Sequence, residues 1–289
     1  MRLSDVFSGN KFTVSIEIFP PKTKEGDQTL RGHLKQLVEY QPAFISCTFG
    51  AGGSTRDRTL QWCHEIQTDL QQTAVAHLTC VGSTREQLIE LLDATDQADI
   101  CNIMALRGDA PQGQDEFQTV TGGLQYANEL VELIRECHAD WGIGVAGYPE
   151  KHQEAPSLDF DLKNLKRKVD AGADVVVTQL FFSNDCFFSF RDRCQTLGIE
   201  IPIVPGIMPI TDYARIQRIT AMCGSSFPED LATRLAAVQD DKAAQFEIGV
   251  EHALIQCEQL KAEGVPGIHF YALNKSDACL QILDALAAE

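Results

Sequence analysis

The sequence lacks long apolar runs, an excess of positive charge, and closely spaced cysteine pairs. No apolar stretch in its 289 residues is long enough to cross a bilayer, so we expect a soluble protein. Basic residues number 24 against 41 acidic ones, and the formal net charge is -17. This charge disfavours nucleic acid and anionic membrane surfaces as partners.

The ten cysteines include no Cys-x-x-Cys pair, and the N-terminus lacks the charged-then-apolar layout of a secretory signal. These absences predict reduced thiols and a cytoplasmic location. The remaining composition, 44% hydrophobic and 22% charged, is that of an ordinary globular protein that can bury a large core. Length alone leaves the number of domains open.

Runs rich in β-branched residues alternate along the chain with segments of helical periodicity. The predicted strands are residues 13–19, 43–49, 75–79, 100–106, 143–148, 175–179, 201–204 and 267–272. The predicted helices are residues 30–40, 56–70, 84–94, 124–138, 158–171, 187–197, 213–222 and 243–263. Eight alternations predict an α/β fold, a (βα)8 TIM barrel formed as a single domain over residues 1–289. An open doubly wound sheet has the same periodicity and is the alternative.

Polar residues follow five of these apolar runs, where packing alone would not select them. They are Thr48, His77, the tripeptide Arg107-Gly108-Asp109, Gln179 and Asn274. Barrel enzymes place their chemistry at the carboxyl ends of the strands. Two irregular stretches, residues 111–123 and 149–157, also follow strands, and long loops there suit binding. The pattern predicts one functional face.

Glu17 lies inside the first predicted strand, where Ile16 and Ile18 share one face. Alternation therefore directs the carboxylate, with Ser15, toward the barrel interior. Burial disfavours a charged carboxylate and raises its pKa, which suits a general acid near neutral pH. A structural glutamate paired with a buried cation is the alternative.

Other polar residues have two readings each. Asp161, Asn164 and Lys168 share one side of a predicted helix, beside Arg167. This side is either a solvated face or a site that binds the hydroxyls and phosphates of a ligand. Gln179 offers a donor and an acceptor to an amide edge, or is satisfied by backbone. The glycine-rich loop at residues 49–53 fails the dinucleotide-binding fingerprint because the third glycine is missing.

Eight segments occur in the order in which they occur in one known family. They are residues 15–21, 77–80, 105–109, 148–150, 164–168, 178–182, 205–209 and 269–274. Together they resemble the methylenetetrahydrofolate reductases of the bacterial, single-domain kind, over nearly the whole chain. The resemblance implies a barrel that holds FAD noncovalently. It also implies two half-reactions in one pocket, in which NAD(P)H reduces the flavin and the reduced flavin converts 5,10-methylenetetrahydrofolate to 5-methyltetrahydrofolate.

The resemblance also implies roles for individual residues. Glu17 would be the acid, and Asp109 would contact both flavin and folate as a second catalytic residue, unless it only caps a helix. The implied flavin-binding residues are Thr48, Phe49, Ala51, His77, Arg107, Gly108, Asp109, Tyr148, His152, Asp161, Asn164, Arg167 and Lys168. The implied substrate-binding residues are Glu17, Thr48, Asp109, Gln179, Arg215, Ile219, Tyr271 and Lys275. No metal is implied, and His77 and His152 have no companion ligands at metal-binding spacing.

Three positions depart from the family pattern. Arg215 stands where bacterial members often have glutamine, Ile219 where they often have an aromatic residue, and Lys275 where an arginine is often found. An arginine can recognise the glutamate tail of folate or the extra phosphate of NADPH, while isoleucine gives apolar contact without stacking. The choice between NADH and NADPH therefore stays open.

Two rival functions remain from the residues themselves. With Lys168 as a Schiff-base lysine, the chain would be a flavin-free barrel lyase. With flavin but without nicotinamide binding, it would be a subunit reduced by another electron donor or partner protein. In either case we expect a homo-oligomer, since acidic barrels with exposed helices usually associate.

Overall fold

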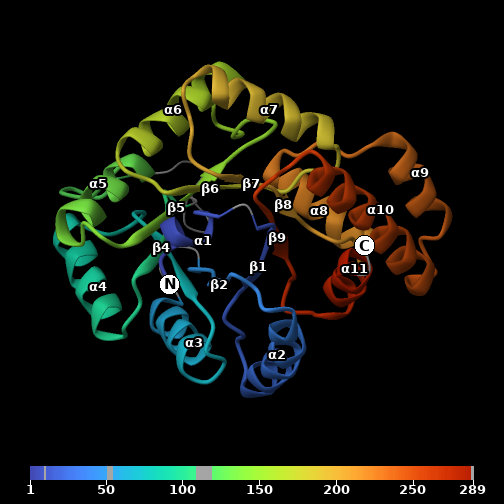
Figure 1. The fold of residues 1–289 in the computed structure, drawn as a ribbon, viewed down its shortest axis with the longest axis horizontal. Helices are drawn as coiled ribbons and strands as arrows, with labels where there is room; N and C mark the ends of the chain where they lie inside the picture. Colours follow the sequence, from blue (N-terminus) through green and yellow to red (C-terminus); the bar gives the residue numbers. More distant parts are fainter. Residues whose placement is uncertain (10, 51–54, 109–118, 288–289) are drawn as a thin grey trace.

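In the computed structural model, which describes residues 1–9, 11–50, 55–108 and 119–287, parallel strands form a barrel inside a ring of helices (Figure 1). The strands are β1 (Thr13–Ile18), β2 (Phe44–Cys47), β3 (Ala74–Thr79), β4 (Asn102–Leu106), β5 (Gly142–Gly147), β6 (Val175–Thr178), β7 (Ile203–Val204), β8 (Gly206–Ile207) and β9 (Gly267–Tyr271). The ends of these strands lie within two residues of the predicted ranges, except that the predicted strand 201–204 continues into β8.

The barrel closes across Pro205, the single residue between β7 and β8. The strand order is β7-β6-β5-β4-β3-β2-β1-β9-β8, so β7 pairs with β6 and β8 pairs with β9. Because proline has no backbone N–H to donate, Pro205 interrupts the pairing, and the predicted strand 201–204 and its continuation form two short strands. Pro205 still accepts a hydrogen bond from the His269 N–H at 2.9 Å. The (βα)8 barrel is therefore confirmed, and the open sheet is excluded.

The helices include all eight predicted segments and three that the periodicity missed. They are α1 (Leu3–Val6), α2 (Lys24–Leu37), α3 (Arg56–Thr68), α4 (Arg85–Gln97), α5 (Ala127–Cys137), α6 (Leu158–Asp170), α7 (Asn184–Thr196), α8 (Tyr213–Cys223), α9 (Glu229–Ala237), α10 (Lys242–Ala262) and α11 (Asp277–Ala287), with a 3₁₀ turn at Val38–Tyr40. The missed helices are α1, α9 and α11. Between β8 and β9 the chain carries α8 and α9 before α10, so α10 and α11 complete the outer ring (Figure 1).

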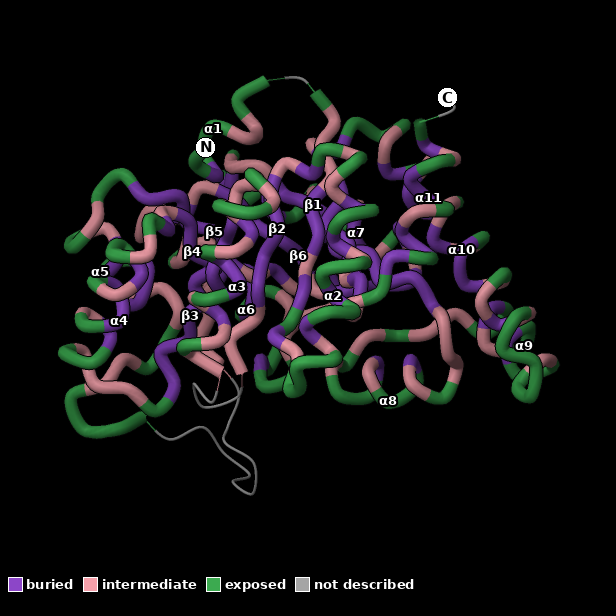
Figure 2. Tube along the Cα trace, turned by 90° about the horizontal axis from the view of Figure 1, so that it is seen from below, coloured by how far each residue is buried: buried purple, intermediate pink, exposed green. Residues whose placement is uncertain are grey.

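The buried apolar residues that the structure describes form two cores around the strands and a third, smaller cluster beside α8 and α9, which includes Ile216 and Leu231. Ile16 and Ile18 belong to the larger core between the strands and the helices. A smaller core fills the barrel beside α1, and its members are Leu3, Phe44, Val75, Met104, Val175, Val177 and Val204. Figure 2 shows α1 and α8 at opposite ends of the barrel, with buried strands between them. Because α1 closes the amino ends of the strands, the carboxyl ends open toward α8.

Candidate functional site

Glu17 is the central ionisable group at the carboxyl end of the barrel. Its strand register pairs it with Ser46 on one side and Tyr271 on the other. Its Oε2 lies 3.4 Å from His77 Nε2 and 3.7 Å from His269 Nε2, and 21% of its side chain is exposed. The predicted inward orientation of Glu17 is therefore confirmed, and its neighbours come from strands far apart in the sequence.

His269 is a site residue that the sequence reasoning missed. It is fully buried, its Nδ1 is hydrogen-bonded to Ser15 Oγ at 2.8 Å, and its ring stacks on Phe44 with centroids 5.6 Å apart. The only available signal was alternation, which places His269 on the same face of its strand as Tyr271. Its approach to Glu17 depends on barrel closure, which no local pattern contains.

The predicted rise in the pKa of Glu17 is wrong for the protein alone. Burial does raise this pKa, but the polar contact with His269 and the charges of His77 and His269 outweigh it, so the pKa is lowered. Burial also lowers the pKa of His77, against the attraction of Glu17. The prediction counted burial and could not count the two histidines.

Several buried polar atoms of this interior have no hydrogen-bond partner within the described part of the chain. They are Ser46 Oγ, His77 Nε2, Thr79 Oγ1 and His269 Nε2. Leaving such an atom unpaired costs about 1–3 kcal/mol, so proteins rarely gather several without a use. Their grouping around Glu17 fits contact with a polar ligand.

A second cluster lies across the ends of β4, β5 and the following loop. Arg107 forms a bidentate ion pair with Glu154, at 2.5 and 2.7 Å. Tyr148 and His152 meet edge to face with centroids 4.9 Å apart, and Lys168 Nζ lies 5.8 Å from the Tyr148 ring centroid. The structure therefore brings together four of the residues that were predicted to bind flavin.

Two residues of the predicted polar stripe on α6 turn inward. Asp161 is buried, and its carboxylate accepts the His152 backbone N–H at 3.0 Å. Lys168 donates to the carbonyl of Ala146, and burial lowers its pKa to about 8 despite the attraction of Asp161. A solvated face does not explain these two positions. Arg167, by contrast, is exposed and donates to Asn164 Oδ1 at 2.9 Å.

The residues of this cluster fit the chemistry of a dinucleotide cofactor such as FAD. Lys168 is a half-buried cation, and Arg167 adds a second cation on the same helix, which suits a pyrophosphate. Asp161 and Asn164 carry side-chain oxygens of the kind that could accept hydrogen bonds from ribose hydroxyls. His152 is neutral near pH 7, because burial and the charge of Arg107 both lower its pKa. Lys168 and Arg167 thus place positive charge where a phosphate would bind, and the neighbouring His152 is neutral.

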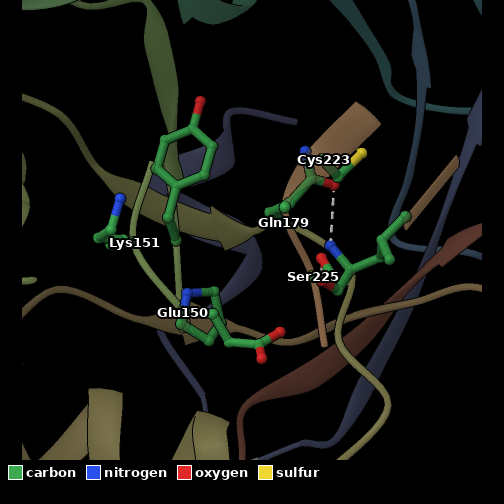
Figure 3. A pocket seen from close by; sticks show the side chains of 9 residues that line it. Glu150, Lys151, Gln179, Cys223 and Ser225 are labelled. Carbon is green, nitrogen blue, oxygen red and sulfur yellow. Dashed lines mark hydrogen bonds between the residues drawn. The ribbon is translucent and has the colours of Figure 1, made fainter. Parts of the chain in front are cut away.

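Gln179 faces a small hollow beside Tyr148 (Figure 3). The hollow is also lined by Glu150, Lys151, Cys223 and Ser225, which the sequence reasoning did not select. The Oε1 atom of Gln179 accepts the Leu180 backbone N–H at 2.9 Å. The Gln179 oxygen is thus satisfied by the backbone, as one alternative expected. The place of Gln179 in the lining of the hollow is compatible with the other alternative, contact with a substrate.

The other predicted substrate residues lie around the same end of the barrel. Tyr271 donates its hydroxyl to the Thr178 carbonyl at 2.6 Å, and Ile219 packs on the same small apolar cluster as Tyr271. Arg215 is half-buried in the first turn of α8. Lys275 is exposed and lines a second hollow that includes Tyr271.

Thr48, Phe49 and Gly108 follow β2 and β4, as predicted. The Thr48 N–H donates to the Ile18 carbonyl at 2.9 Å, which ties the end of β2 to β1. Gly108 has a φ of 90°, and an added Cβ would lie 2.5 Å from Val81 Cγ1, so only glycine fits there. Ala51 and Asp109 lie outside the described residues.

No helix in the part of the chain that the structure describes has both the length and the apolar content needed to span a bilayer. Within the same ranges, no three histidine, cysteine, aspartate or glutamate side chains are grouped as they would be around a metal ion.

Comparison with known proteins gives one consistent result. The family model for methylenetetrahydrofolate reductase matches residues 2–287. A methylenetetrahydrofolate reductase (NADH) of Arabidopsis thaliana is 39% identical over 292 residues, covering 98% of this chain and 49% of the relative. The 5,10-methylenetetrahydrofolate reductase of Escherichia coli strain K12 is 37% identical over 276 residues, covering 96% and 91%.

The chain thus spans about half the length of the plant relatives and about nine tenths of the bacterial one. Among solved structures, a Clostridium thermocellum protein described as binding two copies of 5-methyl-5,6,7,8-tetrahydrofolic acid matches with a TM-score of 0.67. It is 14% identical and the match covers 98% of each chain, so it supports the fold alone. From the family match and these identities, the chain belongs to the methylenetetrahydrofolate reductase family.

Proposed function

We propose that this chain is an FAD-dependent reductase that converts 5,10-methylenetetrahydrofolate to 5-methyltetrahydrofolate with NAD(P)H. The observation that carries the proposal is the position of Glu17 at the barrel mouth, where its Oε2 lies 3.4 and 3.7 Å from the Nε2 atoms of two buried histidines. Family membership supplies the reaction class. The plant relatives are named as NADH enzymes, which favours NADH over NADPH without deciding it.

The residues of the second cluster would hold the flavin. Lys168, Arg167 and Arg107 would face its phosphates, while Asp161 and Asn164 would read hydroxyls. Tyr148, His152 and His77 would line it with Thr48, Phe49, Ala51, Gly108 and Asp109. When bound, FAD would carry the hydride from the nicotinamide to the folate.

Glu17 would deliver the proton that opens the five-membered ring of the folate at nitrogen. In the protein alone its pKa is lowered, so near neutral pH the carboxylate is ionised. A planar ligand that covers the exposed fifth of this side chain would bury it further and raise its pKa. Ser15 Oγ, hydrogen-bonded to His269 Nδ1, would hold this histidine beside the carboxylate.

The substrates would lie between β6, α8 and the end of β9. Gln179 would exchange its backbone hydrogen bond for contact with a pterin or nicotinamide amide edge. Ile219 and Tyr271 would supply apolar contact, while Arg215 and Lys275 would attract a carboxylate or phosphate. We also propose that the barrel forms a single cytoplasmic catalytic domain over residues 1–289 and assembles as a homo-oligomer.

One observation favours the lyase alternative. A lysine with a pKa of about 8 is more nucleophilic near neutral pH than an ordinary lysine, and Lys168 has this property. The same lysine, beside a ribose-reading aspartate, also suits a phosphate. Purified protein without bound flavin would favour the lyase.

The proposed function is tested by an anaerobic spectrum of the purified protein. We expect a yellow protein whose flavin absorbance is bleached by NADH or NADPH and restored by methylenetetrahydrofolate, with 5-methyltetrahydrofolate as product. Flavin that stays oxidised with NADH or NADPH, but that dithionite reduces and methylenetetrahydrofolate then reoxidises, would indicate another electron donor. Flavin that folate cannot reoxidise would contradict the proposal.

A further inference from the structure

The chain makes an unusual turn directly after β9. The Lys275 N–H donates to the Ala272 carbonyl at 3.0 Å, and both central residues of this turn have positive φ, 50° at Leu273 and 59° at Asn274. Turns of this kind favour glycine, asparagine and aspartate at those positions. Asn274 fits the rule, but Leu273 is strained there, so the surrounding structure must hold the turn in place.

The turn directs the Asn274 side chain at the backbone of Phe19. Its Oδ1 accepts the Phe19 N–H at 2.9 Å, and its Nδ2 donates to the Phe19 carbonyl at 2.7 Å. The two residues are 255 positions apart in the sequence. One side-chain amide thus makes both hydrogen bonds that a neighbouring strand would make.

This clamp continues the strand pairing past its last backbone partner. The register of β1 with β9 ends at the pair Glu17 and Tyr271, and Pro20 follows Phe19. On its other side the end of β1 is tied to β2, because the Ile18 carbonyl accepts the Thr48 N–H. Proline cannot donate a further bond. Glu17 sits two residues before the clamped position.

We propose that Asn274 is a positioning residue for Glu17, holding the end of β1 so that the carboxylate stays against His77 and His269. The inference rests on the proposed function in that it assigns the acid role to Glu17. It explains why the strained turn is tolerated, because the positive φ at both positions is what aims the amide at Phe19. The clamp acts on β1 through the backbone of Phe19.

The test compares two glycine variants of the holoenzyme. Asn274→Gly accepts the positive φ without strain but lacks the amide, whereas Leu273→Gly relieves the strain and keeps the amide. In Asn274→Gly we expect faster hydrogen exchange at the Phe19 amide, a raised pKa of the Glu17 carboxyl by carbon NMR, and folate-dependent flavin reoxidation slowed on the order of tenfold. Reduction of the flavin by nicotinamide stays within twofold of wild type. Leu273→Gly keeps the wild-type Phe19 exchange rate and the wild-type Glu17 titration, the two readouts that do not depend on the hollow that Leu273 lines beside Tyr271 and Lys275.

A shifted pH profile of flavin reoxidation in Asn274→Gly, absent from Leu273→Gly, would separate positioning from a general loss of stability. An unchanged Phe19 exchange rate, or an unchanged Glu17 titration, in Asn274→Gly would overturn the inference. These two readouts do not require turnover. If the wild-type flavin is not reoxidised by folate, the proposed function fails, while the exchange and titration still decide whether Asn274 holds Glu17.

Discussion

The two ends of the barrel interior are built from the same alternating strands but have opposite character. At the amino end, Asn102 donates to the Met1 carbonyl and accepts the Leu3 N–H among apolar side chains, so its polar atoms are satisfied. At the carboxyl end, Ser46 and His77 carry buried polar atoms that lack a partner in the described part of the chain. Polar satisfaction at the amino end favours stability, while unpaired polar atoms at the carboxyl end are typical of the face where barrels carry their chemistry.

The largest expected effect comes from removing the acid at the polar end of the barrel, Glu17. Glu17→Gln keeps the shape of the side chain but cannot give up a proton, so folate-dependent reoxidation of the flavin should fall about 10²–10⁴-fold. Reduction of the flavin by nicotinamide should stay near wild type, because that half-reaction needs no such acid. Stopped-flow absorbance under anaerobic conditions measures both steps. Normal folate turnover in this variant would remove Glu17 from the mechanism.

A second prediction concerns Lys168, whose burial opposes folding. Its pKa is about 8 in the folded protein against 10.5 for an ordinary lysine, so the unfolded chain holds the proton more tightly between those pH values. The stability contribution of Lys168 is therefore lowest below about pH 8 and recovers as pH rises toward 10.5. Flavin-free Lys168→Met should be more stable than wild type by roughly 3 kcal/mol at pH 7, and this advantage should shrink at pH 10.

Urea unfolding at the two pH values measures that difference. Fluorescence titration should show weaker FAD binding in the same variant, because the buried cation is gone. A variant that binds FAD like wild type would mean that Lys168 does not face the phosphates. A constant stability difference across pH would mean that its pKa is not lowered.

The smallest expected effects are on stability, in variants that each remove one polar side chain, one at either end of the barrel. Asn102→Ala leaves the buried Leu3 N–H without its partner and should destabilise the protein by about 2 kcal/mol. Ser46→Ala removes a hydroxyl that has no partner among the described residues, so the change should stay within about 1 kcal/mol of zero. Thermal unfolding of both flavin-free variants gives the comparison. Equal destabilisation would show that the two ends do not differ in polar satisfaction.

Much of the fold followed from local patterns because strands and helices are encoded by short-range periodicity. The start of α4 is also encoded locally, because Thr84 and Gln87 form a capping box. Two of the missed helices have local reasons: α1 is four residues long, and α9 is a nine-residue helix in an insertion with no strand of its own. The third, α11, has buried residues at helical spacing that the prediction overlooked. The split of the seventh strand at Pro205 was not predicted, although proline in a strand is a visible warning.

The site was only partly predictable. Glu17, Gln179 and the α6 stripe could be selected because each sits at a strand end or on one helix face. His269 could not, because its meeting with Glu17 joins residues about 250 positions apart through the pairing of β1 with β9. The direction of the Glu17 pKa shift failed for the same reason, since it depends on neighbours that only closure supplies.

The sequence by itself determined the alternation of strands and helices, the inward direction of Glu17 and the polar character of one barrel end. These depend on the two-residue repeat of a strand and on residue type. Only the tertiary structure decided which polar groups meet, which stay unpartnered, and how the Asn274 amide reaches Phe19. Electrostatic shifts and long-range hydrogen bonds depend on distances between groups, and chain closure alone sets those distances.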